Sequence, residues 1–345
     1  MYLADHGVVG AILVALATGV VLQPAVVALM TRRRVMDTPN ERSSHTVPTP
    51  RGGGVAVVAA AVAGLLVLPH AAWAVLLPLA GYAVLGLADD VRGVPVKIRL
   101  VAQLGIGLAA GGVLAGDASV SAAVAVAVAA VGSVWMSGYV NAFNFMDGVN
   151  GIAAAHAVVG GLAFTAVGIL RDLPVLVGAG AVVAAAALTF LPWNAGRARI
   201  FLGDVGSYGL GGALGSLAAY AVLHGVAVEA ALAPLALYLT DTGWTLLRRI
   251  RAGEPWHRAH RCHVYQRLTD VGLSHSQVAF GTAAVAAVLS GCGLLSLDGD
   301  GPARVSADLL GALALMLYVS APRPLARHRH AGAVRAGDDP AEVVS

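Results

Sequence analysis

Aspartate and asparagine gather in three short segments, each beside a long apolar stretch. The segments hold the adjacent pair Asp89 and Asp90, the run 141–151, and Asp204. Carboxylate and amide oxygens suit Mg²⁺ rather than Zn²⁺. Adjacent carboxylates at a membrane boundary repel each other unless a cation or basic partner offsets them or one is held protonated. We expect acid–base or Mg²⁺-dependent chemistry here. The alternatives are a solvated loop at the pair and a plain helix N-cap at Asp204.

The run 141–151 holds more oxygen donors than a chain connection needs. One Asn-Gly or Asp-Gly step is enough for a turn, and this run has one of each with further asparagines before them. The candidate donors are Asn141, Asn144, Asp147 and Asn150. A following polar segment, 192–204, adds Asn194 as a candidate substrate ligand.

A segment at 37–54 combines arginine and histidine with proline and glycine. Prolines fix turns, and glycines let backbone N–H groups approach an anion closely. Arg42 and Arg51 are suited to clamp a phosphate, and His45 lies between them. From the segment alone, an ordinary basic surface loop is an equal alternative.

A second basic segment, 257–267, has three histidines at intervals of three residues. That spacing raises the possibility of a zinc site. Three interleaved arginines would repel a dication, so we favour a basic cluster that faces a polyphosphate. The candidate residues are His260, His263 and Arg267.

The elements that position these segments are membrane spans. The 345 residues are 58% hydrophobic, and 12% are charged, about half the usual charged share of a soluble domain. The apolar residues form long runs, too many and too long for a buried α/β core, and about 20 helical residues cross a bilayer. We expect an all-α polytopic integral membrane protein with about 10–11 transmembrane helices. The predicted spans are 7–30, 54–69, 72–88, 97–116, 120–138, 150–170, 173–191, 205–223, 227–246, 277–296 and 304–321.

The distribution of basic residues predicts the orientation. With the N-terminus outside, every Lys and Arg except Arg171 and Arg304 lies on the cytoplasmic side, as the positive-inside rule requires. This topology also accounts for the basic pI, so no nucleic-acid partner is expected. We expect one catalytic domain, 1–321, and a disordered cytoplasmic tail, 322–345. The expected cytoplasmic loops are 31–53, 89–96, 139–149, 192–204 and 247–276.

All five polar segments therefore face the same side of the membrane. Acidic groups that bind Mg²⁺, beside basic groups that bind phosphate, are recurring parts of phosphoryl-transfer sites. A transporter or flippase for an anionic lipid or sugar is the main alternative, but it would place ionisable residues at mid-membrane. Within the predicted spans the acidic residues are few, Glu229, Asp241 and Asp308, and Asp241 is near an inner end. A non-catalytic scaffold would not need the aspartates.

These motifs, in this order, resemble the polyprenyl-phosphate N-acetylhexosamine-1-phosphate transferases, the glycosyltransferase-4-type family that includes the MraY and WecA enzymes. The matching stretches run from Asp37 to about His275. The patterns Arg-Ser-Ser-His at 42–45, Pro-Thr-Pro-Arg-Gly-Gly-Gly at 48–54 and His-Val-Tyr-Gln-Arg-Leu at 263–268 resemble the WecA-like, O-antigen-initiating branch more than the MraY branch.

The resemblance implies a reaction at the cytoplasmic face of a bacterial inner membrane. A polyprenyl phosphate attacks the β-phosphorus of a UDP-N-acetylhexosamine, which gives polyprenyl-diphospho-sugar and UMP as the first membrane step of a cell-envelope glycan. Mg²⁺ is the implied cofactor, with Mn²⁺ as a substitute, and a homodimer is the implied assembly. The implied sugar is not narrowed beyond an N-acetylhexosamine type.

The resemblance also implies roles for individual residues. One of the paired aspartates, Asp89, would deprotonate or orient the lipid phosphate, and Asp204 would bind Mg²⁺. The implied catalytic residues are Asp89, Asp90, Asp147 and His263, and the implied metal ligands are Asp204 and Asp147. The implied substrate-binding residues are Arg42, His45, Arg51, Lys97, Asn141, Asn144, Asn150, Asn194, His260 and Arg267.

Two departures from the family pattern bear on the substrate. Asn150 stands where the family usually has a second aspartate, so one acidic role is lost or altered. Tyr265 and Gln266 stand where further histidines are common. Both changes affect the expected sugar or nucleotide more than the expected chemistry.

Overall fold

The computed structural model describes residues 6–39, 47–69, 72–255 and 261–326. These residues form a helical bundle, with one two-residue strand pair, Met36–Asp37 (β1) against Thr49–Pro50 (β2). Eight of the described helices are long and apolar enough to cross a membrane. The prediction of an all-α polytopic membrane protein is confirmed.

Each predicted span except the ninth corresponds to one helix. Each of these helices covers the apolar run that predicted it, and the polar residues at the ends of the run form the turns. The helices are α1 (His6–Arg32), α2 (Gly54–Leu66), α3 (Trp73–Arg92), α4 (Val96–Asp117), α5 (Ala122–Met146), α6 (Ile152–Arg171), α7 (Pro174–Asn194), α8 (Gly203–Leu223), α12 (His275–Asp298) and α13 (Gly301–Ser320).

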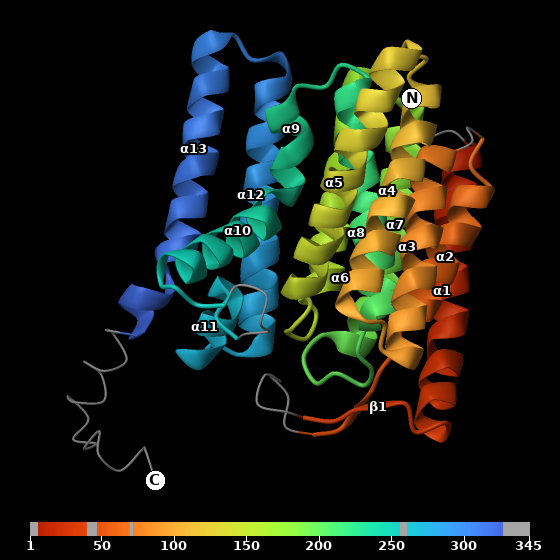
Figure 1. The fold of residues 1–345 in the computed structure, drawn as a ribbon, viewed down its shortest axis with the longest axis vertical. Helices are drawn as coiled ribbons and strands as arrows, with labels where there is room; N and C mark the ends of the chain where they lie inside the picture. The colour runs from red at the N-terminus through yellow and green to blue at the C-terminus, as the bar shows by residue number, and fades with distance from the viewer. Residues whose placement is uncertain (1–5, 40–46, 70–71, 256–260, 327–345) are drawn as a thin grey trace.

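The ninth predicted span, 227–246, is not one helix. It is divided into α9 (Val228–Leu232), a 3₁₀ turn (Ala233–Leu235) and α10 (Ala236–Arg251). The turn contains Pro234, which has no N–H to donate and whose ring crowds the preceding helical turn, so the helix axis changes direction there. Figure 1 shows α10 crossing α12 obliquely. A short helix, α11 (Val264–Asp270), follows α10.

The chain beyond α13 also differs from the expectation. The tail 322–345 was predicted to be disordered, but residues 322–326 are helical. Pro322 begins this turn, and the fixed φ of proline fits the first position of a helix. Residues 327–345 lie outside the described residues.

α8 lies at the centre of the bundle and packs against α3 and α5. Most of its residues are buried, and its glycines let the neighbouring backbones approach closely, as small residues do in membrane bundles. A Cβ placed on Gly86 of α3 would lie closer than 3.0 Å to the carbonyl oxygen of Asp204. A Cβ on Gly54 of α2 would be equally close to the backbone of Gly206. The start of α8 is therefore fixed by direct backbone contact.

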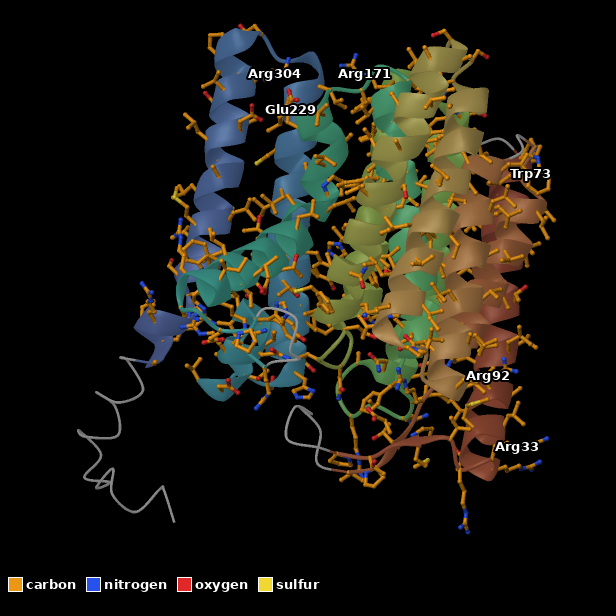
Figure 2. All side chains as sticks on the ribbon, in the orientation of Figure 1. Arg33, Trp73, Arg92, Arg171, Glu229 and Arg304 are labelled. Atoms are coloured by element: carbon orange, nitrogen blue, oxygen red, sulfur yellow. The ribbon has the colours of Figure 1, made fainter. Side chains whose placement is uncertain are left out.

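The polar turns gather at one end of the bundle. Figure 1 shows β1, α11, the α5–α6 turn and the α7–α8 turn at the lower end. Arg33 and Arg92 lie toward that end, and the two exceptions to the charge rule, Arg171 and Arg304, lie at the opposite end (Figure 2). The structure thus brings the described parts of the polar segments, 31–39, 47–53, 89–96, 139–149 and 192–204, to a common end.

Candidate active site

Asp90 joins α3 to the start of α8. Its carboxylate accepts hydrogen bonds from the backbone N–H groups of Asp204 at 3.0 Å and Val205 at 2.9 Å. The first N–H groups of a helix have no partner within it, and the positive end of the helix dipole favours a negative charge. Gly203 has a φ of +77°, and a Cβ there would lie 2.8 Å from the Asp90 carboxylate. Asp90 therefore caps α8 from another helix.

Arg51 bridges two of the predicted aspartates. Its guanidinium lies 2.7 Å from an Asp90 oxygen and 3.0 Å from an Asp204 oxygen. The backbone holds Arg51 there, because the N–H groups that follow it, on Gly52 and Gly53, donate to the Phe201 carbonyl at 3.1 and 2.9 Å. Burial alone would lower the pKa of Arg51, but the carboxylates of Asp204, Asp90 and Asp37 raise that pKa above its ordinary value. The Arg51 guanidinium is thus held between Asp90 at the end of α3 and Asp204 at the start of α8.

Asp89 has a different set of partners from Asp90. Its carboxylate accepts from the Arg99 guanidinium at 2.8 Å, the Tyr208 hydroxyl at 3.0 Å and the Val94 N–H at 2.8 Å. The sequence predicted substrate binding for Lys97 and no role for Arg99. In the structure Lys97 is exposed in the first turn of α4, and Arg99 takes the position beside the carboxylate.

Asn144 and Asp147 approach the same site from the end of α5. The Asn144 side-chain amide donates to an Asp204 oxygen and to the Ser207 hydroxyl, each at 2.9 Å. Asp147, three residues further on, directly follows the helix. Burial raises the pKa of Asp147 well above its usual value, and the nearby charges of Asp204 and Asp90 raise it further while Arg51 opposes them. No side-chain hydrogen bond of Asp147 is present within the described part of the chain.

This donor set fits a hard divalent cation that takes few protein ligands. Asp147 and Asp204 supply carboxylate oxygens, and their mutual repulsion would be relieved by a cation between them. No three His, Cys, Asp or Glu side chains of the described residues lie close enough to enclose a metal alone. Mg²⁺ does not need such a cage, because it commonly binds one or two carboxylates together with water and substrate phosphates.

Three of the predicted substrate-binding asparagines are engaged in holding the backbone or neighbouring helices. Asn141 of α5 donates to Gln103 of α4 at 2.8 Å and to the Ser137 carbonyl. Asn150 donates to the Gly196 carbonyl at 2.7 Å. Asn194 accepts from the Gly151 N–H at 2.6 Å and donates to the Ile200 carbonyl at 2.9 Å, which ties the α5–α6 turn to the α7–α8 turn.

His263 lies in a second cluster, beside α5, where Asp241 is the central residue. The His263 ring is 3.1 Å from an Asp241 oxygen, and the ring centroids of His263 and Phe145 are 6.2 Å apart. The fully buried Asp241 carboxylate also accepts from the N–H groups of Val264 and Tyr265 at 3.0 and 3.2 Å. The sequence singled out Asp241 only as an acid inside a span. In the structure its carboxylate caps the start of α11.

Arg267 of α11 lies near Arg248 and Arg323, and the Asp241 carboxylate is also within electrostatic reach. Burial lowers the pKa of Arg267, and the neighbouring charges of Arg248 and Arg323 lower it further. Such a concentration of positive charge suits an anion. Arg42, His45 and His260 lie outside the described residues, so the structure leaves their predicted roles as predictions.

Removing the cap on α8 should weaken the start of that helix. We expect Asp90→Ala to destabilise the protein by about 1–2 kcal/mol, the usual cost of losing an N-cap acceptor. Asp90→Asn keeps one acceptor oxygen and should cost less. Thermal unfolding of both purified variants in the same detergent measures the difference, and equal loss in the two would contradict the capping role.

Comparisons with known proteins find related sugar-phosphate transferases. The glycosyl transferase family 4 model matches residues 72–222. The chain is 30% identical to the decaprenyl-phosphate N-acetylglucosaminephosphotransferase of Mycobacterium tuberculosis, over 80% of this chain and 78% of that protein. It is 28% identical to a probable undecaprenyl-phosphate N-acetylglucosaminyl 1-phosphate transferase of Bacillus subtilis, over 78% and 79%. A phospho-N-acetylmuramoyl-pentapeptide-transferase of Symbiobacterium thermophilum is 32% identical, over 61% and 72%.

Proposed function

Because this chain belongs to the polyprenyl-phosphate N-acetylhexosamine-1-phosphate transferases, we propose that it transfers a sugar 1-phosphate from a UDP-N-acetylhexosamine to a polyprenyl phosphate. The relatives from Bacillus subtilis and Mycobacterium tuberculosis are named for an N-acetylglucosamine 1-phosphate transfer to undecaprenyl and decaprenyl phosphate. N-acetylglucosamine is accordingly the first sugar to test. The charge distribution supports a cytoplasmic active site in a bacterial plasma membrane.

The observation that carries the proposal is the cluster formed by Asp204, Asp147, Asn144 and Arg51. Three separate segments, the end of α5, the loop after β2 and the start of α8, place these side chains at one end of the bundle, with Asn144 and Arg51 in direct contact with Asp204. Carboxylates for a cation stand beside a guanidinium for a phosphate, as a diphosphate substrate requires. Asp204 and Asp147 would hold Mg²⁺, which when bound supplies charge neutralisation at the diphosphate.

The reaction exchanges one phosphorus–oxygen bond for another. An oxygen of the lipid phosphate forms a bond to the β-phosphorus, the bond from that phosphorus to the bridging oxygen breaks, and UMP leaves with the electron pair. In this scheme Arg51 orients and neutralises the phosphates, and Asn144 holds the Asp204 carboxylate in place. Asp90 and Asp89 act through their neighbours, because the described hydrogen bonds occupy their carboxylates. His263, held by Asp241, would face the sugar-nucleotide side.

A UMP-release assay over a panel of UDP-sugars tests the proposal. Purified protein with polyprenyl phosphate, Mg²⁺ and UDP-N-acetylglucosamine, or a related UDP-N-acetylhexosamine, should release UMP and form a lipid-linked sugar diphosphate. UDP-glucose, which lacks the N-acetyl group, is the matched control. If no UDP-N-acetylhexosamine gives UMP with the wild-type protein, the proposed function is wrong.

Removing divalent cations should stop the same reaction. We expect EDTA to lower UMP release by at least about 10³-fold, because the diphosphate charge is then left uncompensated. Added Mg²⁺ or Mn²⁺ in excess of the chelator should restore the rate, whereas Ca²⁺ should restore it poorly because its coordination is larger and looser. Full activity in EDTA would show that Asp147 and Asp204 act without a metal.

A further inference from the structure

The Asp147 turn needs support from outside its own helix. α5 ends at Met146, and the Asp147 N–H donates to the Asn144 carbonyl at 3.1 Å. That bond fixes the backbone of the helix end, but no side-chain hydrogen bond of Asp147 is found among the described residues. A carboxylate that must meet a cation is useful only if the turn that carries it is held still.

Tyr265 of α11 contacts this turn on both sides of Asp147. Its hydroxyl donates to the Phe145 carbonyl at 3.0 Å. A Cβ built on Gly148 would lie closer than 3.0 Å to that hydroxyl and 3.1 Å from the adjoining ring carbon. The ring is almost completely buried, with 1% of the residue exposed. Tyr265 therefore touches the residues two before and one after Asp147.

The position of Tyr265 is itself fixed by Asp241. The Tyr265 N–H donates to an Asp241 oxygen at 3.2 Å, and the same oxygen accepts the Tyr318 hydroxyl at 2.6 Å. The ring also stacks on His263, with centroids 5.8 Å apart. Since Asp241 belongs to α10 and Tyr318 to α13, α11 connects two helices of the C-terminal group to the end of α5.

We propose that Tyr265 is a positioning residue that sets the place of the Asp147 carboxylate in the cation and diphosphate site. The inference rests on the proposed function and extends it from the residues that touch substrate to one that acts through Asp147. If Tyr265 only filled space, Tyr265→Phe would leave kcat and Mn²⁺ affinity unchanged. Phenylalanine fills the same space and lacks only the hydroxyl group that donates to Phe145.

Gly148 offers an independent way to disturb the same contact. Its φ lies outside the left-handed region, so the backbone accepts an alanine, and the three nearest atoms to the added Cβ all belong to Tyr265. In Tyr265→Phe the hydroxyl is gone and the nearest remaining atom is about 3.1 Å away, at the edge of tolerable contact. The pair Gly148→Ala and Tyr265→Phe thus forms a double-mutant cycle with a predicted rescue.

The experiment measures UMP release and Mn²⁺ affinity, the latter by electron paramagnetic resonance of the bound ion without substrate. We expect Tyr265→Phe to lower kcat about fivefold and weaken Mn²⁺ binding by a similar factor, as loss of one hydrogen bond allows. Gly148→Ala should lower kcat about 10²-fold, because a shift of about 1 Å at a reacting group has that effect. The double variant should return to within about threefold of Tyr265→Phe. Gly138→Ala on α5, where a Cβ meets nothing within 4 Å, is the matched control.

Two results would overturn the inference while leaving the proposed function intact. One is Tyr265→Phe with wild-type kcat and wild-type Mn²⁺ affinity. The other is a double variant no better than Gly148→Ala in either measurement. If Gly148→Ala yields no folded protein, Tyr265→Phe alone decides the matter. If the wild-type protein releases no UMP, the proposed function fails, and Mn²⁺ affinity across the cycle still tests the positioning of Asp147.

Discussion

Asp204→Asn is expected to lower UMP release by about 10³-fold or more. Asparagine keeps the size of the side chain and one acceptor oxygen for Asn144, but it removes the negative charge that Arg51 and the proposed cation share. Losing one charged element of a preorganised phosphate site commonly costs two to three orders of magnitude. Initial rates of UMP release by the purified variant measure the effect, with Mn²⁺ affinity as the second readout.

Asp117→Asn is the matched control for this change. Asp117 ends α4 at the other end of the bundle, where one of its oxygens lies 3.3 Å from the His224 ring. The same charge is removed, but far from the site, and UMP release should stay within about twofold. An Asp204→Asn protein that retains more than a tenth of the wild-type rate would contradict the proposed role of Asp204 as a metal ligand.

Gly86→Ala should prevent normal assembly of the bundle. The added Cβ would overlap the carbonyl of Asp204, which is backbone at the first turn of α8 and has no rotamer to change. Overpacking of this kind costs about 1–3 kcal/mol, and more when neither partner can move. Any protein that folds must displace Asp204, so its rate of UMP release should fall by about 10²-fold. Thermal unfolding and the monodisperse fraction in detergent report the structural part.

Gly105→Ala in α4 is the matched control, because it replaces a helical glycine by alanine where the added Cβ has room. A Cβ on Gly105 meets nothing within 4 Å, and alanine is a better helix former than glycine. Its unfolding temperature and rate should match those of the wild-type protein. If Gly86→Ala behaves like Gly105→Ala, α3 and α8 are not in the close contact described above.

The spans could be predicted because hydropathy and charge act on whole segments. Long apolar runs set the helices, and the side of each basic residue set their direction. The prediction was wrong for the ninth span, which is divided at the turn that contains Pro234. Proline occurs in membrane helices with only a modest kink, and α3 keeps Pro78 within one helix. Whether a proline bends or divides a helix depends on neighbours that the sequence does not place.

The partners of the acidic pair could not be predicted, although the pair itself was identified. Successive residues of an α-helix point about 100° apart, so Asp89 and Asp90 face different neighbours. Asp89 meets Arg99 and Tyr208, whereas Asp90 meets the start of α8 and Arg51. The sequence shows two adjacent charges but not which helix each one faces.

The same geometry distinguishes Lys97, a predicted substrate-binding residue, from Arg99, for which the sequence predicted no role. Two residues along a helix lie on nearly opposite faces, so only one of these two basic residues can turn toward Asp89. The hydrogen-bond partners of Asp241 could not be predicted for another reason. Its partners Val264, Tyr265 and Tyr318 are 23 to 77 residues away, and only the path of α10, set by the divided ninth span, brings them together.

The capping of α8 by Asp90 has a consequence for synthesis of the chain. Helices emerge from the ribosome in order, and Asp204 lies 114 residues after Asp90. The charge on Asp89 is balanced as soon as Arg99 is made, ten residues later. Asp90 gains both the start of α8 and the Phe201 carbonyl that holds the Arg51 segment only when residues 201–205 have been made. The Asp90 carboxylate therefore lacks these partners while α4, α5, α6 and α7 are inserted into the membrane. It gains them together when α8 is inserted.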